Sequence, residues 1–538
     1  MKQLNVSSLS QIHTISNNYD NFYKHQFCLL ADTVLEHKPT LLAIHILNTL
    51  VSNMKQIRKP SVAVTVLIAL TACDGGSDGS SKKTIPMLIR NNAPVAISDN
   101  VPVGKSWLPQ RGSFKASDTD GDHLAISDIL EDGKSVAAVN GVYTLKSGTL
   151  SVKGLDYVYT PLSGQANKLQ FVVSDGTLTG RADLEISAAL SDPLAEQQWH
   201  LRNTGQKAYA LGPGLFKYQV QQLVAKGLSE AEATKQVKTQ FAAWEKALVA
   251  GEDMNVAGAY SQGVTGQNTI AVVVDQGLEI AHEDLEANVL SNRSLNFREG
   301  GLNPTDPTYN GNDGDHGTSV AGLIAAVGWN GKGGRGVAPE TKLIGMNFLE
   351  AQGDLGYYLA HGLPGSGISV EEPIAVFNRS YGETNTWVKS YSEIEESLHE
   401  FSATRLRGAK GAVSIKASGN SFYGEHPLLE GNFCDEGGAV TQGLTCFNAN
   451  MEATATSPYY FVVGAVNSDG KHTSYSTAGA NLLVVAPAGE SGDKSPAMIT
   501  TDQMTCLRGY SSFAADDFYT EHYGPDYFKA VHPFDYPG

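Results

Sequence analysis

The sequence is poor in cysteine, in basic residues and in long apolar runs, and each shortage excludes a class of protein. Only 5 of its 538 residues are cysteine, and none has the spacing of a zinc site. Lys and Arg number 39 against 56 Asp and Glu, a formal net charge of −17. We therefore do not expect a nucleic-acid partner, which requires a concentrated basic face. The apolar run from Val62 to Leu70 is too short to cross a bilayer as a helix.

The N-terminal part of the chain has the order of features of an export signal. A basic start at 54–59 precedes the apolar run, and Leu70-Thr71-Ala72-Cys73 then resembles the lipobox of a bacterial lipoprotein. A Gly- and Ser-rich stretch follows as a flexible tether. The alternative is an ordinary buried apolar segment. We predict translation from Met54, with 1–53 as an unpacked upstream extension, 54–73 as the signal peptide and 74–90 as a linker.

The same resemblance predicts a lipid-anchored protein of the bacterial cell envelope. Cys73 would carry the lipid, and several acyl chains on one cysteine anchor a protein stably. Asp74 resembles the signal that keeps some lipoproteins on the periplasmic face of the inner membrane. The cell surface is the alternative location.

Residues 91–189 have the texture of a small all-β sandwich. Short runs of alternating apolar and polar residues at 148–152, 168–173 and 182–186 are separated by Gly, Asp and Asn. The acidic stretch at 118–122 and the later Val173-Ser174-Asp175-Gly176 resemble cadherin-like repeats of bacterial surface proteins. Carboxylates suit calcium, and a solvated turn is the alternative. The acidic residues are Asp118, Asp120 and Asp122.

Apolar strands and helix signals alternate beyond residue 266, which predicts a parallel α/β sheet with helices on both faces. Before this region, Ser229 and Glu232 form a capping box. It opens an amphipathic helix of about Glu230–Val249, whose apolar stripe is expected to pack on the main domain. The predicted strands are 269–274, 342–346, 374–377, 412–417 and 460–466, and the predicted helices are 316–327 and 390–407.

Three polar residues lie where chemistry is expected in such a sheet, at the carboxyl ends of strands or at a helix start. Asp275 follows an apolar strand, and His316 begins the stretch His316-Gly317-Thr318-Ser319. Asn420 comes after a further predicted strand, in Ala417-Ser418-Gly419-Asn420. These motifs, in this order, resemble the aspartate, histidine and oxyanion-hole segments of subtilisin-like serine proteases, in the kexin-like subgroup. The resemblance covers about 191–510 and implies a triad aspartate, a general base and an oxyanion donor.

The resemblance also implies a site for a protein or peptide substrate. The strand that starts at Ile374 would pair with extended substrate through its edge. Gln276 stands where kexins carry a second acidic residue, which weakens the case for cleavage at dibasic sites. The residues assigned to the substrate are Asp313, Asn378, Ser380, Tyr381 and Gly382.

Calcium is the expected cofactor. The resemblance suggests Asp192, Asp284 and the loop around Asn330 as ligands, since carboxylate and carbonyl oxygens suit this ion. Solvated surface acid is the alternative for each residue. Separately, Cys434 and Cys446 lie close enough in sequence to close a small loop as a disulfide.

One part of the family's machinery is missing from the printed sequence. No Gly-Thr-Ser-x-Ala-x-Pro segment, which carries the family's nucleophile, occurs in it, and neither Ser511 nor Ser512 has that context. We therefore expect 191–510 to be an incomplete catalytic domain, 511–538 to be a truncated tail, and this chain to be inactive. The alternative is a non-catalytic surface or periplasmic protein that binds peptide.

Overall fold

The structure is a computed structural model that describes residues 91–206, 213–246, 249–298, 303–311, 315–385, 387–423, 438, 442–490 and 495–504. The predicted upstream extension, signal peptide and linker, and the tail after residue 510, lie outside these residues. None of the helices described is both long and apolar enough to span a membrane.

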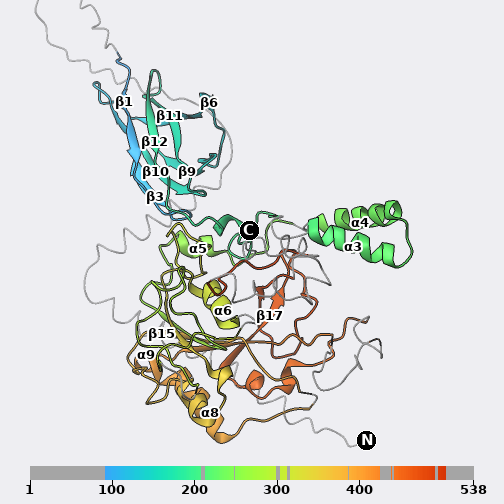
Figure 1. The fold of residues 1–538 in the computed structure, drawn as a ribbon. Coiled ribbons are helices and arrows are strands. Elements are labelled where there is room, and N and C mark those ends of the chain that lie inside the picture. The colour runs from blue at the N-terminus through green and yellow to red at the C-terminus, as the bar shows by residue number, and fades with distance from the viewer. Residues whose placement is uncertain are drawn as a thin grey trace, which may run out of the picture. The chain divides into compact units, whose positions relative to one another are not determined.

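Residues 91–189 form two facing sheets, as the alternating pattern predicts (Figure 1). Leu150 and Tyr159 of one sheet and Ile129, Phe171 and Leu184 of the other belong to one buried core. The first sheet has the order β3 (Gln110–Ser113), β10 (Asp156–Pro161), β9 (Gly148–Lys153), β8 (Val142–Thr144), β7 (Ala138–Val139). The second is β2 (Asp99–Val101), β12 (Thr179–Ile186), β11 (Asn167–Ser174), β5 (Ala125–Glu131), β6 (Lys134–Ser135), and β1 (Val95–Ile97) pairs with β4 (Lys115–Ser117).

A helical hairpin follows, made of α3 (Pro213–Ala225) and α4 (Glu230–Glu245) (Figure 1). The predicted capping box is present, because Ser229 accepts from the Glu232 N–H and Glu232 accepts from the Ser229 N–H. The predicted end of this helix and the predicted partner of its apolar stripe are both wrong. The helix ends at Glu245, and its stripe meets α3, where the rings of Phe216 and Phe241 pack edge to face at 5.2 Å.

A six-stranded, all-parallel sheet forms the centre of the remaining chain, which confirms the predicted α/β class. Its order is β14 (Lys342–Met346), β13 (Ile270–Val274), β15 (Ile374–Arg379), β16 (Val413–Ala417), β17 (Tyr460–Val466), β18 (Val484–Pro487). All five residues of β13 are buried, as expected for a strand covered on both faces.

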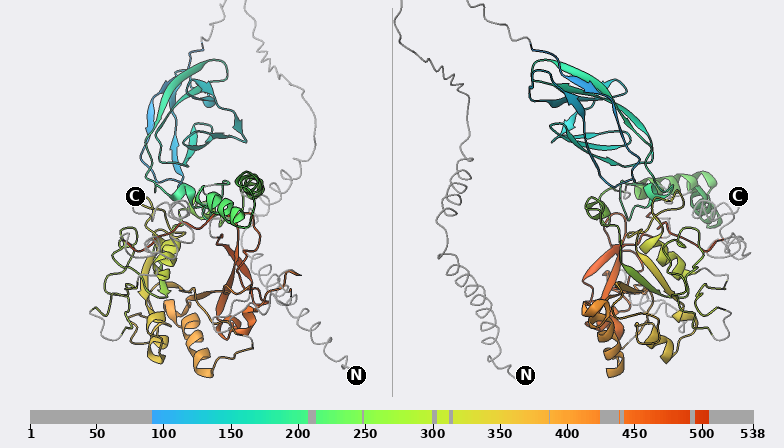
Figure 2. Two further views of the ribbon diagram at one scale, coloured as in Figure 1. Left: turned by 45° about the vertical axis from the view of Figure 1, so that its right-hand side comes forward. Right: turned by 90° about the vertical axis from the view of Figure 1, so that its left-hand side faces the viewer.

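Helices cover both faces of this sheet (Figure 2). On one face, Ala271 and Val273 of β13 pack with Ala321 and Ala325 of α6 (His316–Ala325). The opposite face of β13, Val272 included, belongs to a second core. That core takes in residues of α7 (Asp354–Leu359), α8 (Glu393–Thr404) and α9 (Leu406–Ala409), whereas α5 (Val256–Tyr260) lies in a separate cluster.

A fully buried arginine connects the β-rich region to the parallel-sheet region. The Nε of Arg335 donates to Asp192 over 2.8 Å, and its terminal nitrogens donate to the side chain and carbonyl of Ser106. Its guanidinium also lies over the rings of Trp107 and Trp329, at 4.8 and 4.9 Å from their centroids. The charge is therefore paired, and each of the three guanidinium nitrogens donates a hydrogen bond, as a buried cation requires.

Candidate active site

Asp275 and His316 lie in direct contact, although 41 positions separate them. The Nδ1 of His316 lies 3.0 Å from both carboxylate oxygens of Asp275. Asp275 is fully buried, whereas 44% of the His316 side chain is exposed. This hydrogen bond raises the pKa of His316, and burial opposes it. With Nδ1 directed at the carboxylate, Nε2 is the nitrogen that can take a proton from a group in solution.

The local sequence explains how the histidine is placed. Asp315 is the N-cap of α6 and accepts hydrogen bonds from the N–H and the hydroxyl of Thr318. Burial raises the pKa of Asp315 to about 6. Gly317 lies against the segment after β13, where a Cβ would be 2.0 Å from the carbonyl oxygen of Gly277. Only glycine allows this approach of the helix to the strand end.

Gln276 takes part in the same arrangement. The backbone N–H of His316 donates to its Oε1 over 3.3 Å. The side chain next to Asp275 is thus a neutral amide that holds the start of α6. Asp313 lies outside the described residues, so its predicted contact with substrate stays a prediction.

Strand register brings the predicted substrate and oxyanion segments to the edge of the sheet where Asp275 lies. Val273, Asn378 and Ile415 are level across β13, β15 and β16. Asp275, two positions after Val273, therefore leaves the sheet at the same edge as the Ser380 and Ala417 segments, as the carboxyl ends of parallel strands do. Asn420 follows β16 and is exposed.

The prediction that substrate pairs with the edge of this strand is wrong for residues 374–379, because neither edge is free. β15 pairs with β13 on one side and with β16 on the other. Ser380, Tyr381 and Gly382 lie beyond the strand, and the side chain of Asn378 donates to the Ser380 hydroxyl over 2.9 Å. The predicted pairing with substrate is therefore limited to the segment after residue 379.

A later segment lies across the histidine helix. Thr500 and Thr501 donate their hydroxyl hydrogens to the carbonyl oxygens of Ser319 and Thr318, at 2.5 and 2.7 Å. The N–H of Met504 donates to the Glu279 carboxylate. In the sequence, Thr500-Thr501-Asp502 resembles the approach to the family's nucleophile segment, and its contact with α6 was not predicted.

The three predicted calcium ligands lie close together. The side-chain amide of Asn330 donates to one oxygen of Asp284 over 2.6 Å, while the other oxygen of Asp284 is buried without a hydrogen-bond partner. Burial raises the pKa of Asp284 to about 7. Asp192 accepts from the N–H groups of Trp329 and Asn330 and from Arg335. Asp284 fits a hard cation, because its orphaned carboxylate oxygen would gain a partner. Asp192 is already engaged, and the amide oxygen of Asn330 accepts from the N–H of Lys332.

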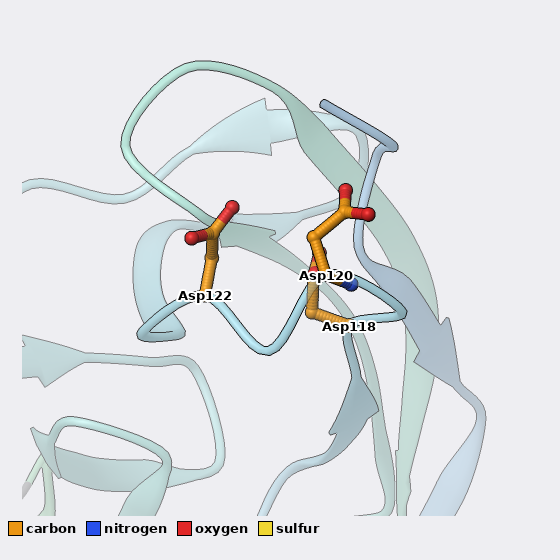
Figure 3. A group of neighbouring side chains, drawn as sticks. All are labelled: Asp118, Asp120 and Asp122. Atoms are coloured by element: carbon orange, nitrogen blue, oxygen red, sulfur yellow. The ribbon is translucent and has the colours of Figure 1, made fainter. Parts of the chain in front are cut away.

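The acidic stretch of the β-rich region is compact. Asp118, Asp120 and Asp122 lie on the loop between β4 and β5 (Figure 3). Each offers an oxygen within 4.8 Å of the others. Asp120 also accepts from Asn92, and its own N–H donates to Asp118. The loop is thus compatible with both proposed interpretations.

Cys446 is disulfide-bonded. Its predicted partner Cys434 and the predicted lipid site Cys73 lie outside the described residues, so both stay predictions.

Residues 266–524 match the model of the subtilase family. The Aeromonas extracellular serine protease of Aeromonas sobria is 33% identical over 334 residues, which cover 62% of this chain and 46% of that protein. The dibasic-processing endoprotease of Yarrowia lipolytica is 30% identical over 245 residues, covering 45% and 22%. The crystal structure of the A. sobria serine protease matches with 32% identity and a TM-score of 0.45, covering 60% of this chain and 47% of that one. The chain thus spans less than half the length of these relatives.

Proposed function

We propose that residues 266–524, which match the model of the subtilase family, form the peptide-hydrolysing site of a kexin-like serine endopeptidase. The contact between buried Asp275 and exposed His316 is the observation that carries the proposal. A general base needs one accessible ring nitrogen and one held by a carboxylate, and this pair supplies both.

The proposed roles follow from the chemistry of acyl transfer. The Nε2 of His316 takes the proton of a serine hydroxyl as that oxygen attacks the scissile carbonyl, and it returns the proton to the leaving amine. Asp275 fixes the imidazole tautomer and stabilises the imidazolium. The side-chain amide of Asn420 donates to the oxyanion as it forms. Substrate lies along Ser380–Gly382 as an added strand.

We further propose that a polypeptide of these 538 residues binds peptide without cleaving it. The sequence contains no Gly-Thr-Ser-x-Ala-x-Pro segment, and loss of the serine in subtilisin lowers kcat by about 10⁶.

Structural calcium and a lipid anchor complete the proposal. Asp284 and Asn330, with Asp192 beside them, would hold calcium, whose charge would neutralise the buried carboxylate. Acylation of Cys73 would attach the protein to a membrane of the bacterial cell envelope. Labelling with a fatty-acid analogue, compared between the natural chain and Cys73→Ala, tests the anchor; equal label in both excludes it.

The enzymatic proposal is tested with a peptide library read by mass spectrometry. The full chain and its His316→Ala and Asp275→Asn variants are incubated with the library, and bound and cleaved peptides are measured. Peptides retained by the full chain and by both variants support a subtilase-type substrate segment, because neither substitution changes Ser380–Gly382. Cleavage that both variants abolish identifies an active enzyme and refutes our proposal of inactivity. Peptides that neither bind nor are cleaved would refute the site itself.

A further inference from the structure

A buried ion pair lies beneath the proposed substrate segment. The Nζ of Lys416 lies 2.8 Å from an Oε of Glu452, and the two side chains are only 3% and 12% exposed. The other Oε of Glu452 accepts from the Thr454 hydroxyl over 2.8 Å. Both charges are therefore neutralised within the protein, which offsets the cost of burying them.

Lys416 joins the two segments that leave the sheet beside Asp275. Its ammonium donates to the carbonyl oxygen of Tyr381 over 3.1 Å and to that of Ala417 over 3.2 Å. Tyr381 belongs to the proposed substrate segment and Ala417 leads to the proposed oxyanion donor Asn420. With Glu452, these carbonyls use all three donors of the ammonium group.

The buried ion pair lies directly behind Gly382 of the substrate segment. A Cβ on Gly382 would lie 2.7 Å from one Glu452 oxygen and 2.8 Å from the Lys416 Nζ. Gly382 itself is exposed. The residue that separates the pair from solvent therefore has no side chain, and a substrate side chain entering between the two segments would reach the pair.

From this position we infer that the Lys416–Glu452 pair determines specificity, and that it selects a neutral residue immediately before the scissile bond. The inference rests on the proposed function, because it takes Asn420 as the donor to the scissile carbonyl. A site for a substrate Arg or Lys needs an unpaired carboxylate, whereas the carboxylate of Glu452 is already paired with Lys416. A substrate carboxylate would likewise meet an ammonium group whose donors are all used.

A second cation strengthens the exclusion of basic side chains. Arg379 is level with Lys416 on the neighbouring strand β15 and is almost fully buried. Its terminal nitrogens donate to Ser414 and to the carbonyl oxygen of Ala360. The buried cations Lys416 and Arg379 thus lie together beside Glu452, while the nearby Glu383 is paired with Lys389, and like charges placed together in a recognition site disfavour binding.

Fluorescein-labelled hexapeptides with a free C-terminal carboxylate provide the test. They differ only in the last residue, Gln, Arg or Glu, and their affinity for the full chain is measured by fluorescence anisotropy. Natural protein is expected to bind the Gln peptide roughly tenfold more tightly than the other two. Lys416→Gln, which frees Glu452, should move the preference to Arg, and Glu452→Gln, which frees Lys416, should move it to Glu, each by roughly tenfold.

Lys168→Gln is the matched control, because Lys168 pairs with Asp183 at the surface of the β-rich region, where 61% and 37% of these side chains are exposed; it should leave the ranking unchanged. Preferences that stay the same in both buried-pair variants overturn the inference, while peptide binding by the natural protein keeps the proposed function. Where a variant fails to fold by circular dichroism, the ranking of the natural protein decides, and equal binding of the Arg and Gln peptides overturns the inference. Absence of binding by all three peptides overturns both proposals.

Discussion

The hydroxyl of Thr501 donates a hydrogen bond to the carbonyl oxygen of Thr318 over 2.7 Å, across 183 positions of the chain. It fixes the last described segment on the helix that begins at His316. Gly322 makes this possible, since a Cβ there would lie 2.2 Å from the Thr501 hydroxyl oxygen. Two segments far apart in the chain therefore meet directly behind His316.

Thr501→Val is expected to weaken this attachment. The hydroxyl is buried and valine has nearly the same shape, so the loss is that of one hydrogen bond, about 0.5–1.5 kcal/mol of unfolding free energy. Urea denaturation measures it. Thr239→Val is the control, because the Thr239 hydroxyl bonds within the exposed face of α4. Equal losses for the two variants would contradict a special role of Thr501.

The pKa of His316 should lie above the ordinary value for histidine. Its hydrogen bond to Asp275 favours the imidazolium. Asp275→Asn removes that charge and should lower the pKa of His316. Histidine-labelled protein followed by NMR across pH 5–9 gives both values, with His316→Ala assigning the resonance. A pKa that does not fall in Asp275→Asn would contradict the proposed pairing.

Gly317→Ala should separate the helix from the strand end. The new Cβ would lie 2.0 Å from the Gly277 carbonyl oxygen and 2.9 Å from the Asp275 Cβ. Overpacking of this kind costs roughly 1–3 kcal/mol, and peptide binding should fall with it. Gly258→Ala, in α5, is the control, since its nearest neighbour would be 3.9 Å away. Thermal unfolding and peptide affinity are measured for both, and equal effects would argue against a close approach at Gly317.

Asp284 should make stability fall as pH rises in the absence of calcium. Its pKa is about 7 when folded against an ordinary 3.8, so the folded state holds a proton that the unfolded chain has lost. The stabilising effect is present below pH 4 and disappears as pH approaches 7. The upper limit is about 4 kcal/mol, at about 1.4 kcal/mol for each pH unit between the two values.

Asp284→Asn should remove this slope, and added calcium should restore stability to the natural protein at pH 7.5 but not to the variant. Melting temperatures at pH 4–8, with calcium and with chelator, test both statements. Asp306→Asn is the control, because Asp306 lies in a separate loop where it accepts from Thr308. A natural protein whose pH slope matches that of Asp284→Asn would contradict the effect.

Local patterns in the sequence predicted much of the parallel-sheet region. Strands 342–346 and 460–466 have the observed bounds, because each is an apolar run that ends at a turn or loop. The start of α6 at His316 was also predicted, and in the structure Asp315 caps it.

Long-range contacts were beyond local sequence patterns. Lys416 and Glu452 are 36 positions apart, and nothing near either residue indicates the other. The same holds for the segment across α6 and for the contact of α4 with α3. Strand β18 was missed because it is short and ends in a proline, which weakens a strand pattern.

The arginine that connects the two regions has a thermodynamic consequence. Arg335 hydrogen-bonds to Ser106 and lies over Trp107 of the β-rich region, so melting that region alone would remove two hydrogen bonds from a buried charged group, at a cost of roughly 1.5–3 kcal/mol each. The β-rich region and the parallel-sheet region should therefore unfold cooperatively, as one heat-absorption peak in scanning calorimetry.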